Sequence, residues 1–475
     1  MSTPAVTPDP IRNEPAAIET GLNTLFQWAA ALRPGQLPPP VKQRAAGILF
    51  DDIAAMTAAW REPEFRRLYP RLMAQNRAAE STIFCQPGVK ADRSTAALVN
   101  ATAANWLELD EGYRNAPCHA GLYTLPALLA LAEADDAPFE HVLHHLAVTY
   151  EIITRIARAF PQRRTVMQSH GRYAALAAAI TTALHHGYDA QLLAHAACAA
   201  VTLITPAPRS HLAGGALVRN VWAGVGARNG MDAADWARAG ISGTPYSIYD
   251  VYSVVLNSDC KPEALIEGLG DDWAVMSGYT KMYACCQHLH AAVEATLDMR
   301  AEILGRKPDD IAAIHVETHA LALPLDQRRP HTSLAAKFSM SHAMAAAVLL
   351  GKADESAFNS DIIHDADIDA LRQRVSMAPW SGNIPPAPND RPARVQIRYK
   401  DGTVVASECL SARGGADRPF PQADVLAKIE RLAGTSYPGL PRIAAQYMSC
   451  ATADHALPWR QVLAAMRGAT PQATT

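Results

Sequence analysis

The segment WLELDEGYRNAPCHAGL places three acids and one histidine in an otherwise apolar, alanine-rich part of the chain. The acids are Glu108, Asp110 and Glu111, and the histidine is His119. A carboxylate and an imidazole that share a cleft are a common arrangement for proton transfer. The alternative is that these acids only cap and solvate the end of a helix, where exposed carboxylates are ordinary.

The residues on both sides of this segment predict buried helices. Residues 95–106 are small and apolar, and residues 124–134 form an apolar run with Pro126 in its expected first turn. A polar segment between two core helices has few ways to satisfy its carboxylates by solvent alone. We therefore expect the two helices to hold the acids and the histidine at a cleft.

A second group of reactive side chains lies in the segment YTKMYACCQHLHAAVEA. Here Lys281 precedes a predicted amphipathic helix that contains Cys285, Cys286, His288 and His290. A lysine ammonium and the positive end of a helix would together favour a carboxylate ligand. The alternative is that both cysteines belong to the core and that the two histidines lie on opposite sides of the helix, one of them bonded to a backbone carbonyl.

Other candidate motifs fail on their spacing. His315, Glu317 and His319 do not form the zinc motif HExxH, and on a strand all three side chains would face the solvent side of a sheet. The glycines of GVGARNG follow a predicted helix rather than a strand, so we expect close helix packing there and no dinucleotide site. The motifs therefore support neither a metal site nor a nucleotide site.

Length and composition restrict the class of protein. A chain of 475 residues is too long for one simple core, and 49% apolar with 19% charged residues is typical of a soluble, well-packed protein. A net charge of −3 gives no strongly basic surface, which argues against nucleic acid as a partner. The eight cysteines lack CxxC spacing and indicate reduced thiols in a cytoplasmic setting. No apolar run is long enough to span a membrane.

The periodicity of the chain changes once. Helical spacing of apolar residues dominates residues 18–272. Residues 311–320 then alternate apolar and polar side chains, and residues 393–411 form two alternating runs joined by Asp401 and Gly402, a strong hairpin signal. A smaller α+β domain is therefore expected after the helical region.

The order of the motifs resembles that of the MmgE/PrpD family, which includes 2-methylcitrate dehydratase, cis-aconitate decarboxylase and an iminodisuccinate epimerase. The resemblance covers about Leu22 to Gly434 and is carried by LPPPVKQRAAGILFDDIAA, STAALVNATAANWLELDEGYRNAPCHAGLYTLPALLALAE, YTKMYACCQHLHAAVEA, AAKFSMSHAMAAAVLLGKADESAF and ARVQIRYKDGTVVA. It implies a homodimer whose interdomain cleft binds small di- or tricarboxylates without a metal or an organic cofactor.

The resemblance and the residue patterns together give a domain division. We expect a mainly α protein with an all-helical domain at residues 18–272 and 421–475. A smaller α+β lid domain is expected at residues 273–420, inserted before the C-terminal helices. Residues 1–17 carry prolines and acids without the features of a secretory signal, and we expect a disordered leader there.

The resemblance also assigns residues of the site. The family's leading aspartate falls on Glu108, its loop histidine on His119 and its lid lysine on Lys281. A lysine of the family falls on Arg219, in the segment ALVRNVWAGVGARNG. Arginine keeps the positive charge, and its planar guanidinium is suited to binding a carboxylate through two hydrogen bonds. A later histidine of the family is kept as His290.

Three further positions depart from the family. Gln168 aligns with a usual histidine, although His170 is near enough to substitute if the loop shifts. Cys286 aligns with a histidine of the cis-aconitate decarboxylases, and Gly112 with a usual threonine. Loss of two imidazoles argues against the cis-aconitate decarboxylase reaction, because imidazoles carry protons near neutral pH.

These assignments lead to a hypothesis for the function. Arg219 and Lys281 would bind the carboxylates of a small acid while His119 exchanges a proton at carbon, with Glu108 orienting it or acting as the partner acid. This predicts a cytoplasmic lyase of the dehydratase or decarboxylase type. The alternatives are an isomerase, an epimerase or a cyclase, or a catalytically weakened carboxylate-binding dimer. The glycines at positions 112, 214 and 215 weakly favour a larger acid as substrate.

Overall fold

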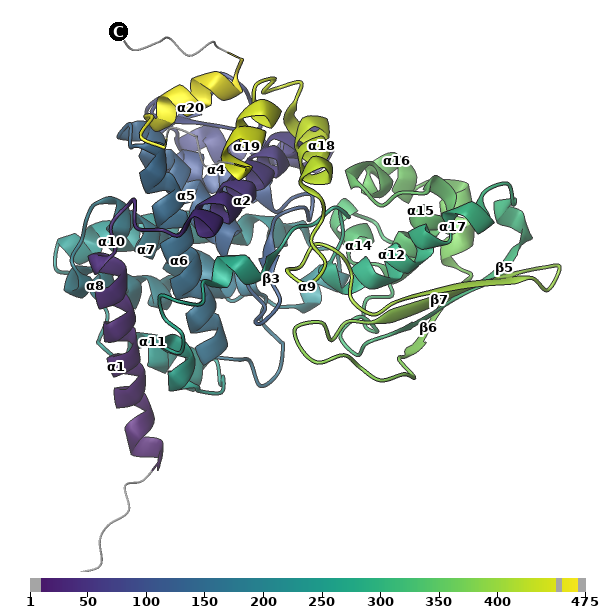
Figure 1. Ribbon diagram of the computed structural model, residues 1–475, viewed down its shortest axis with the longest axis horizontal. Helices are drawn as coiled ribbons and strands as arrows, with labels where there is room; N and C mark the ends of the chain where they lie inside the picture. Colours follow the sequence, from purple (N-terminus) through teal and green to yellow (C-terminus); the bar gives the residue numbers. More distant parts are fainter. Residues whose placement is uncertain (1–9, 450–454, 469–475) are drawn as a thin grey trace, which may run out of the picture.

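The computed structural model describes residues 10–449 and 455–468. Figure 1 shows a large body of helices beside a smaller body built on a sheet. We call residues 10–258, 422–449 and 455–468 the helical body, and residues 290–409 the sheet body. Helices make up most of the described residues, so the prediction of a mainly α fold is confirmed. The domain boundaries at residues 273 and 420 stay a prediction.

The helical body is built around helices that pack closely on one another through small residues. Its first helices are α1 (Pro10–Ala31), α2 (Pro39–Ala58), α3 (Pro63–Leu72), α4 (Arg93–Ala104), α5 (Ala120–Ala134), α6 (Phe139–Ala159), α7 (Ser169–His185), α8 (Ala190–Ala200), α9 (Ser210–Ala213) and α10 (Trp222–Arg238). Helix α7 packs on α5, α6, α8 and α10, and α4 packs on α5 and α10. The two helices that flank the acidic segment, α4 and α5, are therefore both core helices, as predicted.

Glycines allow the closest of these contacts. A Cβ atom at Gly226 of α10 would lie 2.5 Å from the Cβ atom of Ala174, and one at Gly230 would lie 2.2 Å from the backbone oxygen of Ala175. Neither distance is sterically possible, so a side chain at either position would push α10 away from α7. This confirms that the glycines of GVGARNG serve helix packing.

The end of the chain returns to the helical body. Helices α18 (Gln422–Ala433), α19 (Leu440–Met448) and α20 (Trp459–Met466) lie at the top of Figure 1. Helices α18 and α19 pack on α2, and α20 packs on α5 and α6. A buried ion pair of 2.8 Å between Lys428 and Asp51 joins α18 to α2.

The sheet body contains four strands in the order β6-β5-β7-β8. These are β5 (Ile311–Thr318), β6 (Val375–Pro379), β7 (Ala393–Tyr399) and β8 (Val404–Cys409). Strands β7 and β8 form the predicted hairpin, in which Gly402 adopts a φ of +88° and the backbone N–H of Thr403 donates to Asp401. Strand β6 runs parallel to β5. This strand completes the sheet beside β5.

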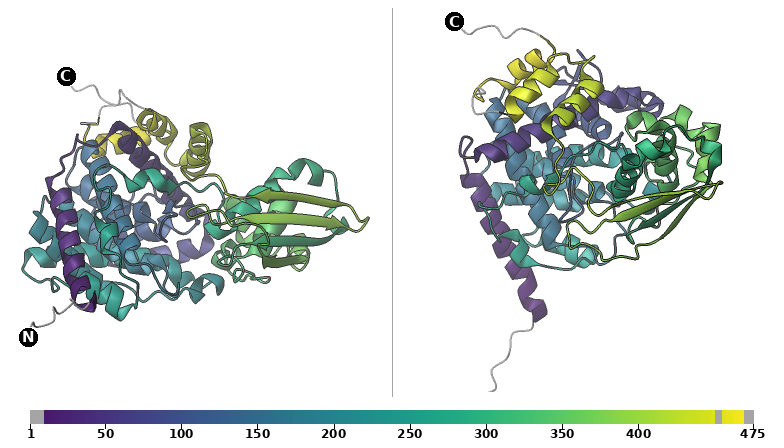
Figure 2. Two further views of the ribbon diagram at one scale, coloured as in Figure 1. Left: turned by 60° about the horizontal axis from the view of Figure 1, so that its bottom comes forward. Right: turned by 45° about the vertical axis from the view of Figure 1, so that its right-hand side comes forward.

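Helices cover one face of this sheet. Helices α12 (His290–Asp298), α15 (Met340–Leu350) and α17 (Ala366–Arg372) lie together above the strands in Figure 1 and behind them in the left view of Figure 2. Helix α12 packs on β7 and β8, and α15 packs on β6. Ile314 and Val316 of β5 are fully buried, whereas His315 and Glu317 are only partly buried, as the alternation predicted. His319 lies beyond the strand and is buried, which corrects its predicted solvent-facing position.

Two predicted boundaries were wrong. Helix α1 begins at Pro10, so residues 10–17 are helical rather than part of a disordered leader, and residues 1–9 lie outside the described residues. Proline is tolerated at a first helical position because its missing N–H has no partner there. Helix α5 begins at Ala120, which leaves Pro126 inside the helix.

Two general expectations concern the thiols and the membrane. The cysteines within the described residues are free thiols, which agrees with the predicted reduced state. Within the same residues, none of the helices combines the length and the apolar character that crossing a bilayer requires.

Buried histidines predict that the protein is labile to acid. Burial lowers the pKa of His144 and of His342 to about 4, whereas an unfolded histidine has a pKa of about 6.5. Each neutral ring therefore stabilises the fold fully above about pH 6.5, and this stabilisation, about 3 kcal/mol per ring, is lost as the pH falls through 4. Urea unfolding should give a clearly lower free energy of unfolding at pH 4.5 than at pH 7.5.

The exposed histidine His364 provides the control for this prediction. Replacing His364 with alanine should leave the pH dependence of stability unchanged, whereas His342→Gln should flatten it. A free energy of unfolding that is constant between the two pH values would contradict the prediction.

Candidate active site

A short antiparallel ladder brings the acidic segment to Lys281. Strand β3 (Gly112–Tyr113) pairs with β4 (Gly278–Tyr279), with Gly112 opposite Tyr279 and Tyr113 opposite Gly278. This pairing joins two parts of the chain that are far apart in sequence. Asp110 precedes one strand and Lys281 follows the other, so both side chains reach the same place.

The side chain of Tyr279 occupies the space that a side chain at position 112 would need. A Cβ atom there would lie 2.3 Å from the hydroxyl oxygen of Tyr279, and one at Gly215 would lie 2.5 Å from the Cβ atom of Ala335. The space that these glycines leave is therefore filled by neighbouring side chains. The interpretation that they enlarge the pocket for a bigger acid was wrong.

A cavity of about 110 Å³ lies where the helical body meets the sheet body. Its apolar wall includes Leu212, Leu325 and Phe338. The charged residues that line it are Glu108, Arg209, Arg219, Lys281 and Arg391. Four of these five side chains are cationic, which makes the cavity suited to a small acid with more than one carboxylate.

Glu108 holds two of the cations at the cavity wall. Its carboxylate lies 2.5 Å from Nη1 of Arg219 and 3.7 Å from Nζ of Lys281, and all three side chains are almost fully buried. Glu108 has a φ of +56°, in the left-handed region that residues other than glycine rarely adopt. Such strain costs roughly 1–3 kcal/mol and is typical of functional sites.

Asp110 lies behind the cavity between Lys281 and His119. Its carboxylate is 3.4 Å from Nζ of Lys281 and 2.8 Å from Nδ1 of His119. Burial alone would raise the pKa of Asp110, but the nearby lysine and histidine hold it well below its usual range. The pKa of Lys281 is raised by Asp110 and Glu108 in spite of its burial. The carboxylate and the ammonium therefore both stay charged.

The hydrogen bonds of His119 fix the orientation of its ring. The residue is the N-cap of α5, and its Nδ1 lies 2.7 Å from the backbone oxygen of Glu111. That oxygen and the Asp110 carboxylate can only accept hydrogen bonds, so Nδ1 carries the proton. This leaves Nε2 unprotonated in the neutral ring, as a proton acceptor for a ligand in the cavity that His119 lines.

Glu111 has a different role from the other two acids. Its side chain accepts hydrogen bonds from the backbone N–H of Gly121 (2.6 Å) and from the hydroxyl of Tyr150 (3.0 Å). It therefore binds the N-terminus of the helix that carries His119 at its N-cap. The helix-capping alternative is thus correct for Glu111, whereas Glu108 and Asp110 form ion pairs at the cavity.

The side chains of Gln168 and His170 lie in different surroundings. Gln168 lines the cavity and caps α7, where its side chain accepts a hydrogen bond from the backbone N–H of His170. The fully buried His170 lies beside His119, with ring centroids 5.1 Å apart, and its Nδ1 lies 3.0 Å from the hydroxyl of Tyr123. Burial, together with the positive charge of Arg219, lowers the pKa of His170 well below its usual range.

The segment after Lys281 does not form the single helix that was predicted, and its two histidines lie in different surroundings. Helix α12 begins only at His290, and Cys286 is the N-cap of a short 3-10 helix, Gln287–Leu289. Cys286 and His288 line the cavity, whereas Nε2 of His290 lies 3.1 Å from the backbone oxygen of Cys285. Burial raises the pKa of the Cys286 thiol and lowers that of His290 to about 3. The histidine of this segment that lies at the candidate substrate site is therefore His288 and not His290, as the resemblance implied.

Two arginines of the cavity were not identified from the sequence. Arg209 precedes the short helix α9, and Arg391 lies in the proline-rich connection before β7. The Arg391 guanidinium donates a hydrogen bond to Gln287, another residue of the cavity wall. Neither arginine belongs to a motif, so only its position in space marks it as a candidate ligand-binding residue.

The chain belongs to the MmgE/PrpD family. Residues 23–258 match the MmgE/PrpD N-terminal domain, and residues 283–456 match the MmgE/PrpD C-terminal domain. This confirms the resemblance that the motifs carried.

Its relatives include cis-aconitate decarboxylases of fungi. The cis-aconitate decarboxylase of Aspergillus terreus is 24% identical over 445 residues, which cover 86% of this chain and 89% of the relative. The cis-aconitate decarboxylase-like protein oryM of Aspergillus oryzae is 23% identical over 457 residues, covering 86% of this chain and 90% of the relative. Both similarities extend over most of each chain.

Proposed function

We propose that this protein is a lyase that acts on a small di- or tricarboxylate by proton transfer at carbon. One observation carries the proposal: the imidazole of His119 shares a cavity with four cationic side chains. The cations would bind the carboxylates and fix the position of the adjacent carbon. Membership of the MmgE/PrpD family and the names of the relatives support the same reaction class.

In the proposed mechanism, His119 exchanges the proton and the cations stabilise the charge. For dehydration, Nε2 of His119 removes a proton from the carbon next to a carboxylate. The ring then gives this proton to the departing hydroxyl group as the C–O bond breaks, which releases water. For decarboxylation, a C–C bond breaks to release carbon dioxide, and the protonated ring donates a proton to carbon. Both reactions pass through an enolate-like anion, which Arg219 and Lys281 would stabilise in a site shielded from water.

Decarboxylation remains a candidate beside dehydration. The sequence argued against it because the aligned positions 168 and 286 lack histidines. However, His170 lies beside His119, and His288 lines the cavity. Two imidazoles are therefore available close to both positions, which weakens that argument. The names of the relatives favour decarboxylation, and no observation favours a cyclase.

The test is to incubate the protein with candidate di- and tricarboxylates in deuterated water. The proposal predicts deuterium at the carbon next to a carboxylate, together with an unsaturated product or released carbon dioxide. Deuterium without either product would indicate the isomerase or epimerase alternative. Binding without deuterium would indicate the carboxylate-binding alternative and refute the proposed reaction.

Arg391 provides a separate prediction about substrate binding. Replacing it with methionine should raise KM by roughly 10–100-fold with little change in kcat, because a hydrogen bond to a charged group is worth about 1.5–3 kcal/mol. Steady-state kinetics with the substrate found above would measure both constants. The matched control is Arg398→Met, an exposed arginine on β7 of the same sheet, which should keep the wild-type KM. An unchanged KM in Arg391→Met would remove that residue from the binding site.

The remaining parts of the proposal concern assembly and cofactors. The proposal includes a cytoplasmic homodimer, which the family resemblance implies and sedimentation of the purified protein would test. It requires no cofactor, because the groups that bind the substrate and move the proton are side chains of this chain. Full activity after exhaustive dialysis against a chelator is the expected result.

A further inference from the structure

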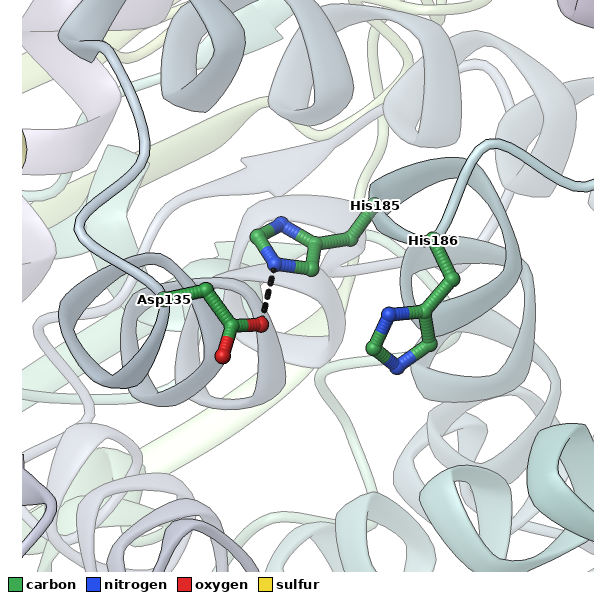
Figure 3. Close-up of side chains that lie close together, drawn as sticks. All are labelled: Asp135, His185 and His186. Atoms are coloured by element: carbon green, nitrogen blue, oxygen red, sulfur yellow. Dashed lines mark hydrogen bonds and ion pairs between the residues drawn. The ribbon is translucent and has the colours of Figure 1, made fainter.

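Two helices of the candidate active site end at a second cluster of polar side chains. Helix α5 begins after His119 and is followed by Asp135, whereas α7 begins after Gln168 and ends at His185, with His186 as its C-cap. Figure 3 shows Asp135, His185 and His186 close together. A helix of 15 residues is about 22 Å long, so this cluster lies far from the cavity.

The three side chains have the spacing of metal ligands. Each offers one ligand atom, and these atoms all lie within 4.8 Å of one another. Nε2 of His185 and Oδ2 of Asp135 are 2.9 Å apart. Two ligands on adjacent corners of a coordination octahedron, each about 2.1 Å from the ion, are about 3.0 Å apart. This pair therefore already has the separation that coordination requires, without movement of the backbone.

The surroundings of the cluster also favour a cation. Helices α5 and α7 both end at it, and their last carbonyl groups carry partial negative charge. The guanidinium of Arg93 lies 3.3 Å from Oδ1 of Asp135 and also donates a hydrogen bond of 3.5 Å to Oδ2, the oxygen that faces His185. It can hold the carboxylate in place, as partners of metal ligands commonly do. Asp135 and His186 are exposed, so an ion can enter from solvent.

We propose that Asp135, His185 and His186 bind a divalent transition-metal ion, with water at the remaining positions. Two imidazole nitrogens and one carboxylate oxygen suit Zn²⁺, Co²⁺ or Ni²⁺, whereas Mg²⁺ and Ca²⁺ prefer oxygen ligands alone. The bound ion joins the C-terminal ends of α5 and α7. The N-terminal ends of the same two helices carry His119 and Gln168, so the ion stabilises the scaffold of the cavity without contacting the substrate.

The experiment titrates the full chain, without a polyhistidine tag and after treatment with a chelator, with Zn²⁺ in a calorimeter. One ion should bind per chain and raise the Tm. The variants His186→Ala and Asp135→Asn should each weaken binding by more than the roughly tenfold to hundredfold that is lost when a residue that only hydrogen-bonds to a metal ligand is removed. Co²⁺ should give a visible absorption spectrum of nitrogen and oxygen ligation that both variants lose.

The control variant is His364→Ala. His364 is also exposed and also follows the last residue of a helix, α16 (Ser360–Ile363), but lies in the sheet body. This variant should bind Zn²⁺ like the wild type. Circular dichroism would verify that His186→Ala is folded, which is expected because its side chain is exposed. The proposal is overturned if the wild type binds no Zn²⁺, or if both site variants bind it with unchanged affinity.

Discussion

Replacing His119 with asparagine should lower kcat by roughly 10²–10⁴-fold, the range that a general acid or base contributes. Asparagine is a favourable N-cap residue, and its amide can still donate to the backbone oxygen of Glu111. It cannot accept and return a proton. The substitution therefore separates the chemistry of residue 119 from its position at the start of α5.

The measurement is steady-state kinetics together with a thermal unfolding curve. We expect KM and Tm to stay close to the wild-type values, because the ring is not among the cations that would bind the substrate. His119→Ala should give a similar loss of kcat and a somewhat lower Tm, because alanine is a poor N-cap. If His119→Asn keeps more than a tenth of the wild-type kcat, the proton is transferred by another group, and His288 would be the next candidate.

The second large effect is expected when a buried lysine is replaced. Lys281 and Lys337 form a matched pair for this test. Lys281 lines the cavity with Glu108 and Asp110 around it, and Lys337 is equally buried beside Glu62 but does not line the cavity. Replacing either lysine with glutamine leaves a buried carboxylate without this cation. We expect each variant to lose about 3–5 kcal/mol of unfolding free energy.

Only one of the two variants should lose activity. Lys281→Gln should lower kcat/KM by roughly 10²–10³-fold, as removal of one group that stabilises a developing anion does. Lys337→Gln should keep the wild-type kcat/KM at a temperature where it is folded. Urea unfolding and kinetics on both proteins would measure the two effects separately. Equal losses of kcat/KM in both variants would mean that the loss reflects stability alone.

The sequence by itself determined the components of the site. Acids, a histidine and a lysine stood in apolar segments where charge is costly, and this cost is the physical reason that they indicated a cavity. Helical periodicity predicted α4 and α5 on either side of His119, and Asp401 with Gly402 predicted the β7–β8 hairpin. These are local features, because hydrophobic spacing and turn chemistry act over a few residues.

Only the tertiary structure decided how these components act together. The β3–β4 ladder places Lys281 beside Asp110, and His288 rather than His290 lines the cavity. Arg391 reaches the same cavity from the sheet body. Each of these outcomes depends on contacts between residues far apart in the chain, which no local pattern encodes.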